Sequence, residues 1–350
     1  MPLIESHPFR RILVTRTDRI GDLVLTTPVF EALRRKFPGA YLACLTFLEN
    51  RQIVEGNPHL DQVILYDKGG SEKGWFGNFR FARRLAKKHF DTAIHFHPTN
   101  RMHWVSWLAG IPVRIGYRKK SAWALTHSMD DKKSEGLKHE SEYNFELLKF
   151  LGVEPPERAK PYFPLKEKDQ VSLHFLLRNL GLDGKTPYAV LNPSASCPSK
   201  IWHGERFARL ADHLQEKLGL RAVLIGSRSD RRFSRKVKQS TAHSVVDLTG
   251  KLSLGMLGWL LKQSSILISN DSGPVHIARA VGTPAVSIFG RNLAGLSPKR
   301  WGPLGEEARV VHKEVACPVC LAHECRINFL CLDVVSVEDV FEEVKALIPL

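Results

Sequence analysis

The sequence contains no apolar run approaching the roughly 18–20 residues that a membrane-spanning helix needs. Its first residues, MPLIESHPFRRILV, also lack the apolar core of a secretory signal peptide. No internal repeat and no low-complexity tract is present. These absences favour a globular protein that stays in the cytoplasm.

Two ligand-binding motifs are missing as well. The glycine pattern GxGxxG of dinucleotide-binding proteins does not occur, and residues 17–22, after the first expected strand, read TDRIGD instead. A dehydrogenase is therefore disfavoured. No DxD-type metal motif is evident either, since Asp130-Asp131 stands beside lysines in an expected loop.

Acidic residues are in short supply, because 36 Asp and Glu stand against 51 Lys and Arg, a formal net charge of +15. A surplus of this size usually accompanies an anionic partner, such as nucleic acid, a membrane surface or a phosphorylated substrate. Three basic clusters lie in the first half: Arg80, Arg83, Arg84, Lys87 and Lys88; Arg114, Arg118, Lys119 and Lys120; and Lys132 and Lys133. Such clusters bind phosphates or lipid headgroups, although a solvated helix face explains the first one well. No nucleic-acid-binding motif accompanies them, and we expect the aromatic residues to stand apart from them.

Expected strands and helices alternate along the chain, which favours an α/β fold with parallel, doubly wound sheets. The strands are expected at 11–16, 41–47, 62–67, 92–97, 113–117, 188–192, 221–225, 245–248, 266–269 and 285–289. The helices are expected at 23–37, 79–89, 101–108, 140–151, 205–217, 230–240, 254–263, 274–281 and 337–348. Prolines interrupt the pattern near 155–170, so we predict domains at 1–160 and 161–350 with a cleft between them.

The turn after the first strand carries a candidate general base. Asp22 is expected at the carboxyl edge of the sheet, where a carboxylate can take a proton from a substrate hydroxyl. The alternative is structural: Asp22 caps the following helix, and Asp18 pairs with Arg16 or Arg19.

Two segments of the second half are candidates for binding a diphosphate. The first segment follows a strand and contains Ser194, Ser196 and Lys200. Its lysine would neutralise the charge on a leaving phosphate. The alternative is that this segment is a solvated loop. Residues 265–290 run from a strand through Asp271 and Ser272 into a helix, whose first N–H groups form an anion site. Both residues are also good N-caps, which is the structural alternative.

Four of the six cysteines fall within one short window. They are Cys317, Cys320, Cys325 and Cys331. A structural zinc site is one interpretation, although the usual pairing of two C-x₂-C motifs is missing. The other is a cluster of reduced cysteines that packs a loop.

Three motifs in order resemble glycosyltransferase family 9, the ADP-heptose:lipopolysaccharide heptosyltransferases. They are RILVTRTDRIGDLVLTTPVFEALRRKFP, NPSASCPSKIWHGERFARLADHL and LISNDSGPVHIARAVGTPAVSIFG. RWGP at 300–303 and the cysteine segment running into SVEDV also match, so the resemblance covers most of the chain. Within the family, the cysteine segment favours the enzymes that add the second heptose.

The resemblance implies a GT-B fold, in which two Rossmann-like domains face a cleft, the first binding the acceptor and the second the nucleotide-sugar. It implies inversion at the sugar without a metal ion or other cofactor, with Asp22 as general base and Lys200 on the donor phosphates. The implied donor-binding residues are Ser194, Ser196, Lys200, Asp230, Leu252, Asp271, Ser272, Gly273 and His276. The implied acceptor-binding residues are Arg19, Arg101, Arg118, Lys119 and Lys120.

The implied donor is ADP-heptose, and the implied acceptor is an anionic lipid A carrying Kdo and heptose. That acceptor would bring the protein into peripheral contact with the inner face of the inner membrane, with no nucleic acid as partner. Two alternatives stay open. One is a related enzyme with another nucleotide-sugar donor, and the other is a basic nucleic-acid-binding protein, which the isoelectric point of about 9.6 allows.

Overall fold

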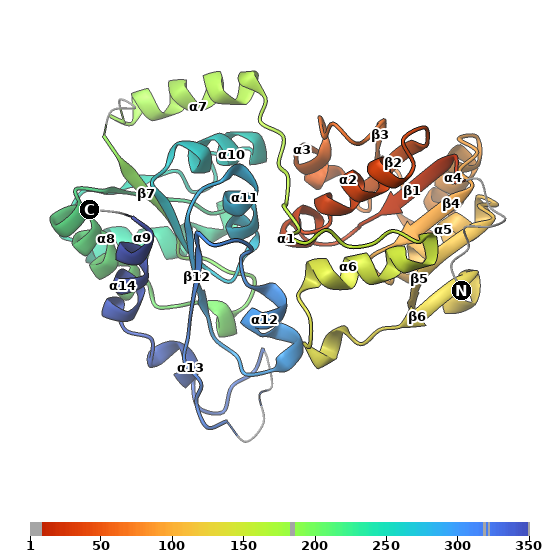
Figure 1. Ribbon diagram of the computed structural model, residues 1–350. Coiled ribbons are helices and arrows are strands. Elements are labelled where there is room, and N and C mark those ends of the chain that lie inside the picture. Colours follow the sequence, from red (N-terminus) through yellow and green to blue (C-terminus); the bar gives the residue numbers. More distant parts are fainter. Residues whose placement is uncertain (1–8, 183–185, 318–319, 321–322, 349–350) are drawn as a thin grey trace. The chain divides into compact units, whose positions relative to one another are not determined.

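The computed structural model describes residues 9–182, 186–317, 320 and 323–348, and Figure 1 shows their course. The chain divides into two compact units. The first comprises Met1–Ser134 and Lys138–Pro164, and the second comprises Glu135–Leu137 and Leu165–Leu350. Each unit has its own six-stranded parallel sheet with helices around it, so the expected α/β class is confirmed.

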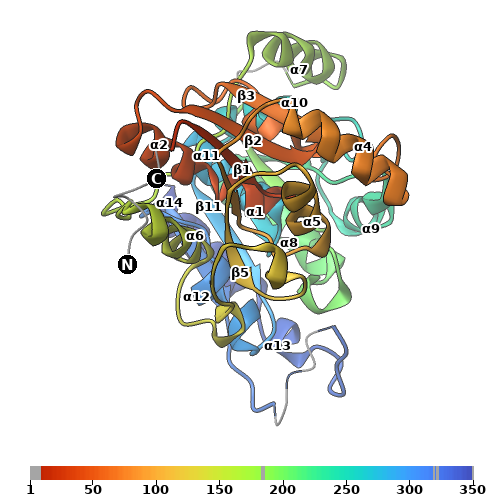
Figure 2. The ribbon, with the colours of Figure 1, turned by 90° about the vertical axis from the view of Figure 1, so that its right-hand side faces the viewer.

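The sheet of the first unit has the strand order β3-β2-β1-β4-β5-β6. Its strands are β1 (Arg11–Thr15), β2 (Tyr41–Phe47), β3 (Gln62–Tyr66), β4 (Thr92–His95), β5 (Val113–Arg118) and β6 (His127–Asp130). Its helices are α1 (Ile20–Val24), α2 (Thr27–Lys36), α3 (Arg51–Val54), α4 (Gly74–Ala86), α5 (Asn100–Leu108) and α6 (Glu140–Leu148). Figure 2 shows α4 and α5 along one face of this sheet and α2 and α6 along the other.

The sheet of the second unit has the order β12-β11-β10-β7-β8-β9. Its strands are β7 (Tyr188–Asn192), β8 (Arg221–Leu224), β9 (Val246–Asp247), β10 (Ile266–Asn270), β11 (Ala285–Phe289) and β12 (Ala308–His312). Its helices are α7 (Glu167–Asn179), α8 (Gly204–Leu218), α9 (Arg231–Ser240), α10 (Leu254–Gln263), α11 (Gly273–Val281), α12 (Pro298–Trp301), α13 (Leu330–Asp333) and α14 (Val337–Leu347).

Short 3₁₀ turns connect several of these elements. They are η2 (Leu48–Asn50), η3 (Ala122–Ala124), η4 (Lys133–Glu135), η5 (Lys149–Leu151), η6 (Pro198–Lys200), η7 (Arg228–Asp230) and η8 (Ala294–Leu296). The central strands are buried along nearly their whole length because helices cover both of their faces. In β7 and β10 every residue is buried, and β10 pairs with β7 from Ile266 opposite Ala189 to Ser269 opposite Asn192.

Several expected boundaries are wrong. The helix expected at 23–37 is two helices, because Pro28 lies in the first turn of α2 and lacks the N–H that a continuous helix requires. Helix α7 was not expected. It begins near the end of the expected linker, and its weak sequence signal reflects the burial of only Leu173 and Leu177 among its residues. Strands β6 and β12 were not expected either, since both run along a sheet edge and are only partly buried. Among the described residues no helix is long and apolar enough to span a membrane.

Candidate active site

Both sheets reverse their strand order at a central pair, and the loops that follow these strands hold most of the candidate residues. The reversal lies between β1 and β4 in the first sheet and between β10 and β7 in the second. At such a switch point the two loops leave in opposite directions, which opens a place for a ligand beyond the carboxyl ends of the strands. Asp22 follows β1, Lys200 follows β7, and Asp271 follows β10.

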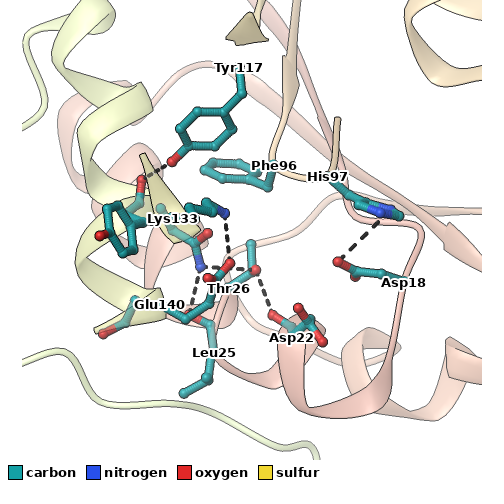
Figure 3. A network of polar contacts seen from close by, with 12 residues as sticks. Asp18, Asp22, Leu25, Thr26, Phe96, His97, Tyr117, Lys133 and Glu140 are labelled. Carbon is teal, nitrogen blue, oxygen red and sulfur yellow. Dashed lines mark hydrogen bonds and ion pairs between the residues drawn. The ribbon is translucent and has the colours of Figure 1, made fainter. Parts of the chain in front are cut away.

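In the first unit, one buried arginine holds three carboxylates. Arg16 directly follows β1 and is only 1% exposed. Its Nε donates to Oδ1 of Asp18 at 2.9 Å, and its Nη2 donates to Oδ1 of Asp22 at 2.5 Å and to Oε1 of Glu140 at 3.0 Å. Its Nη1 donates to Oδ1 of Asn144 at 3.1 Å. Figure 3 shows these acidic side chains, which come from the β1–α1 loop (Asp18), from α1 (Asp22) and from α6 (Glu140).

A second cation balances the charge of this network. The Nζ atom of Lys133 lies 2.7 Å from Oε1 of Glu140. Burial raises the pKa of Asp18 to about 8, with Arg16 opposing the shift and Asp22 and Glu140 adding to it. Burial thus favours the protonated form of Asp18, while Asp22 and Glu140 lie opposite Arg16 and Lys133.

The placement of Asp22 suits a general base. It lies inside α1, its side chain is 15% exposed, and Arg16 binds only its Oδ1. Among the described residues its second oxygen has no hydrogen-bond partner, so it can accept a proton from a substrate hydroxyl. The capping alternative is wrong, since Arg19 occupies the N-cap of α1, whereas Asp18 does pair with Arg16.

His97 was not singled out from the sequence, yet it completes this network. It follows β4, the neighbour of β1, and its Nδ1 lies 2.9 Å from the carbonyl oxygen of Thr17 and 3.9 Å from Oδ2 of Asp18. Burial, reinforced by Arg16, lowers the pKa of His97, which favours the neutral ring. Its position at a strand end beside β1 is the signal that could have pointed to it.

The five basic residues predicted to bind the acceptor follow β1, β4 and β5, so they share the carboxyl edge of the first sheet. Arg19 is exposed at the start of α1, and Arg101, in the first turn of α5, lies 5.6 Å from the centre of the Tyr66 ring. The other three, Arg118, Lys119 and Lys120, are exposed at the end of β5. Arg118 lies 3.5 Å from Asp130 and Lys119 lies 3.3 Å from Asp131, so these two acids partly neutralise the cluster.

In the second unit, Asp271 bridges two cations. Its Oδ2 lies 2.7 Å from Nζ of Lys200 and 2.9 Å from Nη2 of Arg291. All three side chains are at least 88% buried, since their exposed fractions are 8%, 12% and 3%. One carboxylate with two cations leaves one positive charge in excess, which suits an anionic ligand. Arg291 was missed from the sequence, although it stands just after β11 in the same way that Asp271 stands just after β10.

Hydroxyl and amide groups hold the loops around this cluster. The Nδ2 atom of Asn192 donates to Oγ of Ser269 at 3.1 Å and to Oγ of Ser272 at 2.8 Å. Ser194 donates to Oδ1 of Asn192 at 3.0 Å, whereas Ser196 is exposed. The structure therefore ties Ser194 and Ser272 to one network and leaves Ser196 toward solvent.

The start of α11 differs from the expected cap. Ser272 is the N-cap residue, but its side chain makes no capping hydrogen bond because its Oγ is engaged with Asn192 and Ser269. Pro274 has no N–H, and the N–H of Val275 donates to the carbonyl oxygen of Ser272 at 3.2 Å, so Gly273 supplies the N–H group of the first turn that remains suited to an anion. Gly273 opens the helix, and His276 is buried within it.

The remaining predicted donor residues follow the next strands of the same sheet. Asp230 lies after β8 and Leu252 after β9, so the candidate residues follow β10, β7, β8 and β9 in the order of the sheet. Leu252 is half-buried in the turn before α10. Oδ2 of Asp230 accepts hydrogen bonds from N and Oγ of Ser227 at 2.8 and 2.6 Å, in a capping box that engages one of its oxygens.

The cysteine window does not form a ligand cage in the part of the chain that the structure describes. No group of three or more His, Cys, Asp or Glu side chains there is arranged to hold a metal ion. Cys331 is buried, and its Sγ accepts a hydrogen bond from the N–H of Arg291 at 3.3 Å. The Sγ of Cys325 accepts one from the N–H of Phe329 at 3.0 Å. Metal-bound thiolates accept such hydrogen bonds as well, so these two contacts do not separate the two interpretations of the window, and both stay predictions.

Comparison with known proteins yields a consistent set of matches. The model of glycosyltransferase family 9 (heptosyltransferase) matches residues 78–330. Lipopolysaccharide heptosyltransferase 3 of Escherichia coli K12 is 26% identical over 346 residues, which is 94% of this chain and 95% of that protein.

Two solved structures extend these matches to the fold. The glycosyl transferase family 9 protein of Veillonella parvula is 25% identical, with a TM-score of 0.87 over 98% of both chains. The ADP-heptose lipopolysaccharide heptosyltransferase II of E. coli has a TM-score of 0.79 at 22% identity, over 96% of this chain and 98% of that one. The fold of both units is therefore that of these glycosyltransferases.

Proposed function

Because the chain belongs to glycosyltransferase family 9, the heptosyltransferase family, we propose that it transfers heptose from ADP-heptose to the inner core of lipopolysaccharide. The observation that carries this proposal is the cluster of Lys200, Asp271 and Arg291 beside the start of α11. Its surplus positive charge and the N–H of Gly273 at the start of that helix suit a diphosphate, and Asp271 adds a carboxylate that can accept hydrogen bonds from sugar hydroxyls. The relatives named above support heptose as the sugar.

In the proposed reaction, Asp22 removes the proton of an acceptor hydroxyl, whose oxygen attacks the anomeric carbon of the donor. The bond from that carbon to the diphosphate oxygen breaks, ADP leaves with the bonding electrons, and the configuration inverts. Lys200, Arg291 and the first turn of α11 stabilise the negative charge that grows on the departing diphosphate. These groups supply the charge that a divalent ion supplies in other enzymes, so the proposed reaction requires no metal.

The proposed acceptor is lipid A carrying Kdo and heptose, which bears phosphate and carboxylate groups. Arg19, Arg101, Arg118, Lys119 and Lys120 lie at the carboxyl edge of the sheet that also holds Asp22, which supports binding of an anionic acceptor there. Because lipid A lies in a membrane, the proposal includes peripheral contact with the cytoplasmic face of the inner membrane. The assignment of the acceptor to residues 1–160 and of the donor to residues 161–350 is part of the same proposal.

A family 9 enzyme with another nucleotide-sugar is the second candidate. Asp230, whose capping box with Ser227 engages Oδ2, is the carboxylate expected beside the ribose, and because every such donor contains ribose it does not select the base. The nucleic-acid-binding alternative has lost its support, since the family is one of enzymes.

A thermal-shift comparison of ADP-, GDP-, UDP- and CMP-sugars tests the donor assignment. We expect ADP-heptose to raise the melting temperature at concentrations where the other three classes leave it unchanged, because binding to the native state stabilises it. Stabilisation by another nucleotide class alone would favour the second candidate. A shift by ADP-heptose without turnover on a heptose-containing lipid A acceptor would contradict the acceptor assignment only.

A further inference from the structure

Four of the seven tryptophans lie side by side on the first unit. Trp75 belongs to α4, Trp104 and Trp107 belong to α5, and Trp123 belongs to η3. The ring centres of Trp75 and Trp104 are 5.6 Å apart, those of Trp104 and Trp123 are 6.4 Å apart, and those of Trp123 and Trp107 are 5.4 Å apart. Three segments distant in sequence thus form one continuous row, along the face of the sheet on which Figure 2 shows α4 and α5.

This row is exposed, unlike most large aromatic groups. Trp75 is 57% exposed, Trp123 is 63% exposed, and the neighbouring Phe76 is 86% exposed. We call the set the aromatic surface; it comprises Trp75, Phe76, Phe79, Trp104, Trp107 and Trp123. Single exposed apolar residues need no explanation, but a contiguous aromatic group marks an interaction site.

The fold of the unit does not require the aromatic surface. Helices α4 and α5 pack on the core through other residues, among them the buried Phe81, Leu85, Met102 and Val105. Trp104 and Trp107 are three residues apart, as are Phe76 and Phe79, so each pair lies on one outward side of its helix. The core of the first unit therefore does not depend on the residues of the aromatic surface.

The surroundings of the aromatic surface are strongly basic. Residues 73–90 and 92–129 contain no Asp or Glu. They contain Lys73, Arg80, Arg83, Arg84, Lys87, Lys88, Arg101, Arg114, Arg118, Lys119 and Lys120. Three of these residues pair with acids outside the two segments, namely Arg84, Arg118 and Lys119. Three exposed ones form no ion pair among the described residues, namely Lys73, Arg83 and Lys120. The expectation that aromatic residues stand apart from the basic clusters is therefore wrong.

We propose that the aromatic surface is where the protein docks on an anionic phospholipid bilayer. Indole rings favour the boundary between acyl chains and headgroups, where the apolar ring is buried while its N–H stays hydrated. Lysines and arginines around them are attracted to anionic headgroups. Since no described helix can span a membrane, this mode of binding leaves the protein on the surface of the bilayer.

The packing of the rings favours a bilayer over single-stranded nucleic acid. Bases stack on open aromatic faces. Here the planes of Trp75 and Trp104 meet at 85° and those of Trp107 and Trp123 at 75°, so an edge of one ring covers a face of the next. The four packed indole rings can therefore enter the headgroup region of a bilayer together. This inference rests on the proposed function, because it assigns a surface to the membrane contact proposed there.

The test is sedimentation with vesicles, which requires neither donor nor turnover. The wild-type chain should sediment with phosphatidylglycerol/phosphatidylethanolamine vesicles, more weakly at high salt, and little with phosphatidylcholine vesicles. The triple variant Trp75→Ser/Phe76→Ser/Trp123→Ser should bind the anionic vesicles at least about tenfold more weakly, because three interfacial anchors are lost. Phe175→Ser, which removes a 70% exposed aromatic from α7 in the second unit, is the matched control and should bind as the wild type does.

Tryptophan quenching by lipids brominated on their acyl chains gives a second measurement, with strong quenching expected in the wild type and little in the triple variant. Equal vesicle binding by the two proteins, or equal binding of neutral and anionic vesicles, would overturn the proposal. So would a wild-type dimer that the triple substitution dissociates, or binding of single-stranded DNA in place of vesicles. Far-UV circular dichroism and the thermal shift with ADP-heptose should match the wild type. If that shift is absent from both proteins, the proposed function fails while the vesicle result still stands.

Discussion

Asp18 and Asp22 belong to the same short segment, yet their surroundings give them different chemistry. Both contact Arg16, but burial raises the pKa of Asp18, while Asp22 lies inside α1 with its second oxygen available to a substrate. At the scale of residues, burial is therefore what separates a structural carboxyl group from a candidate base, since both share Arg16 as a partner. Glu140 and Lys133 complete the arrangement from a distant part of the chain.

Replacing Asp22 by asparagine should lower kcat by roughly 10²–10⁴-fold, the range that general base catalysis typically contributes. The shape of the side chain is kept and its oxygen can still accept the hydrogen bond from Arg16, so the thermal shift with ADP-heptose should be unchanged. Turnover with ADP-heptose and a heptose-containing lipid A acceptor measures the effect. Asp18→Asn is the matched control and should retain most of the activity; full activity in Asp22→Asn would remove it as the base.

Asp18 also makes stability depend on pH. Burial raises its pKa to about 8 in the folded protein from the ordinary value of 3.8, so the native state binds a proton that the unfolded chain has released between these values. The contribution of Asp18 to the free energy of unfolding is therefore complete below pH 4 and is lost as the pH rises through 8. Urea unfolding at pH 5, 7 and 9 should show a smaller loss of stability in Asp18→Asn than in the wild type. An equal loss of unfolding free energy between pH 5 and pH 9 in the two proteins would contradict the raised pKa of Asp18.

At the scale of elements, the loops that follow the strands position the candidate donor-binding residues. Gly290 joins β11 to Arg291, and a Cβ atom at this position would lie 2.9 Å from the carbonyl oxygen of Ser199 and 2.9 Å from Cγ of Leu332. Ser199 in turn precedes Lys200 in η6. The close approach of these two loops therefore places the two cations on either side of Asp271.

Gly290→Ala should lower the free energy of unfolding by about 1–3 kcal/mol, because the added methyl group forces the loops apart. It should also weaken the binding of ADP-heptose, since the separation displaces Lys200 and Arg291. Gly39→Ala is the matched control, because nothing lies within 4 Å of its added Cβ. Chemical denaturation measures the free energy of unfolding, and titration with ADP-heptose measures the donor affinity. Donor affinity equal to that of the wild type would show that the loop contact does not position the cations.

At the scale of the whole molecule, the chain repeats one architecture twice and gives each copy a different set of charges. The strand order of both sheets reverses at the centre, but the first switch point collects carboxylates around Arg16 and the second collects cations around Asp271. In the proposed reaction, one sheet supplies the proton acceptor and the other the positive charge that a metal ion would otherwise provide.

Chelation should therefore leave turnover unchanged. Dialysis against EDTA is expected to alter kcat by less than about twofold, whereas Lys200→Ala in the same buffer should lower both donor affinity and kcat, because each lost charge-assisted hydrogen bond contributes about 1.5–3 kcal/mol. Initial rates before and after dialysis, with and without added Mg²⁺, measure this. A loss of rate on dialysis that Mg²⁺ restores would contradict the metal-free mechanism.

The sequence by itself determined the α/β class, the family and the strand ends that carry Asp22, Lys200 and Asp271. These follow from local pattern, since apolar strands alternate with amphipathic helices and the residues after a parallel strand face its carboxyl edge. Only the tertiary structure decided what surrounds those residues. Arg16 meets Glu140, and Asp271 meets Arg291, because parallel pairing brings together loops that are distant in sequence.

The same limit applies to the surface. Each aromatic residue of α4 and α5 is visible in the sequence, but helical periodicity does not tell an outward-facing tryptophan from one that belongs to a core. Packing of α4 against α5 decided that Trp75, Trp104 and Trp123 form one exposed row amid basic residues. Local composition fixes which groups are present, and only the pairing of distant segments fixes their neighbours, their burial and hence their charge.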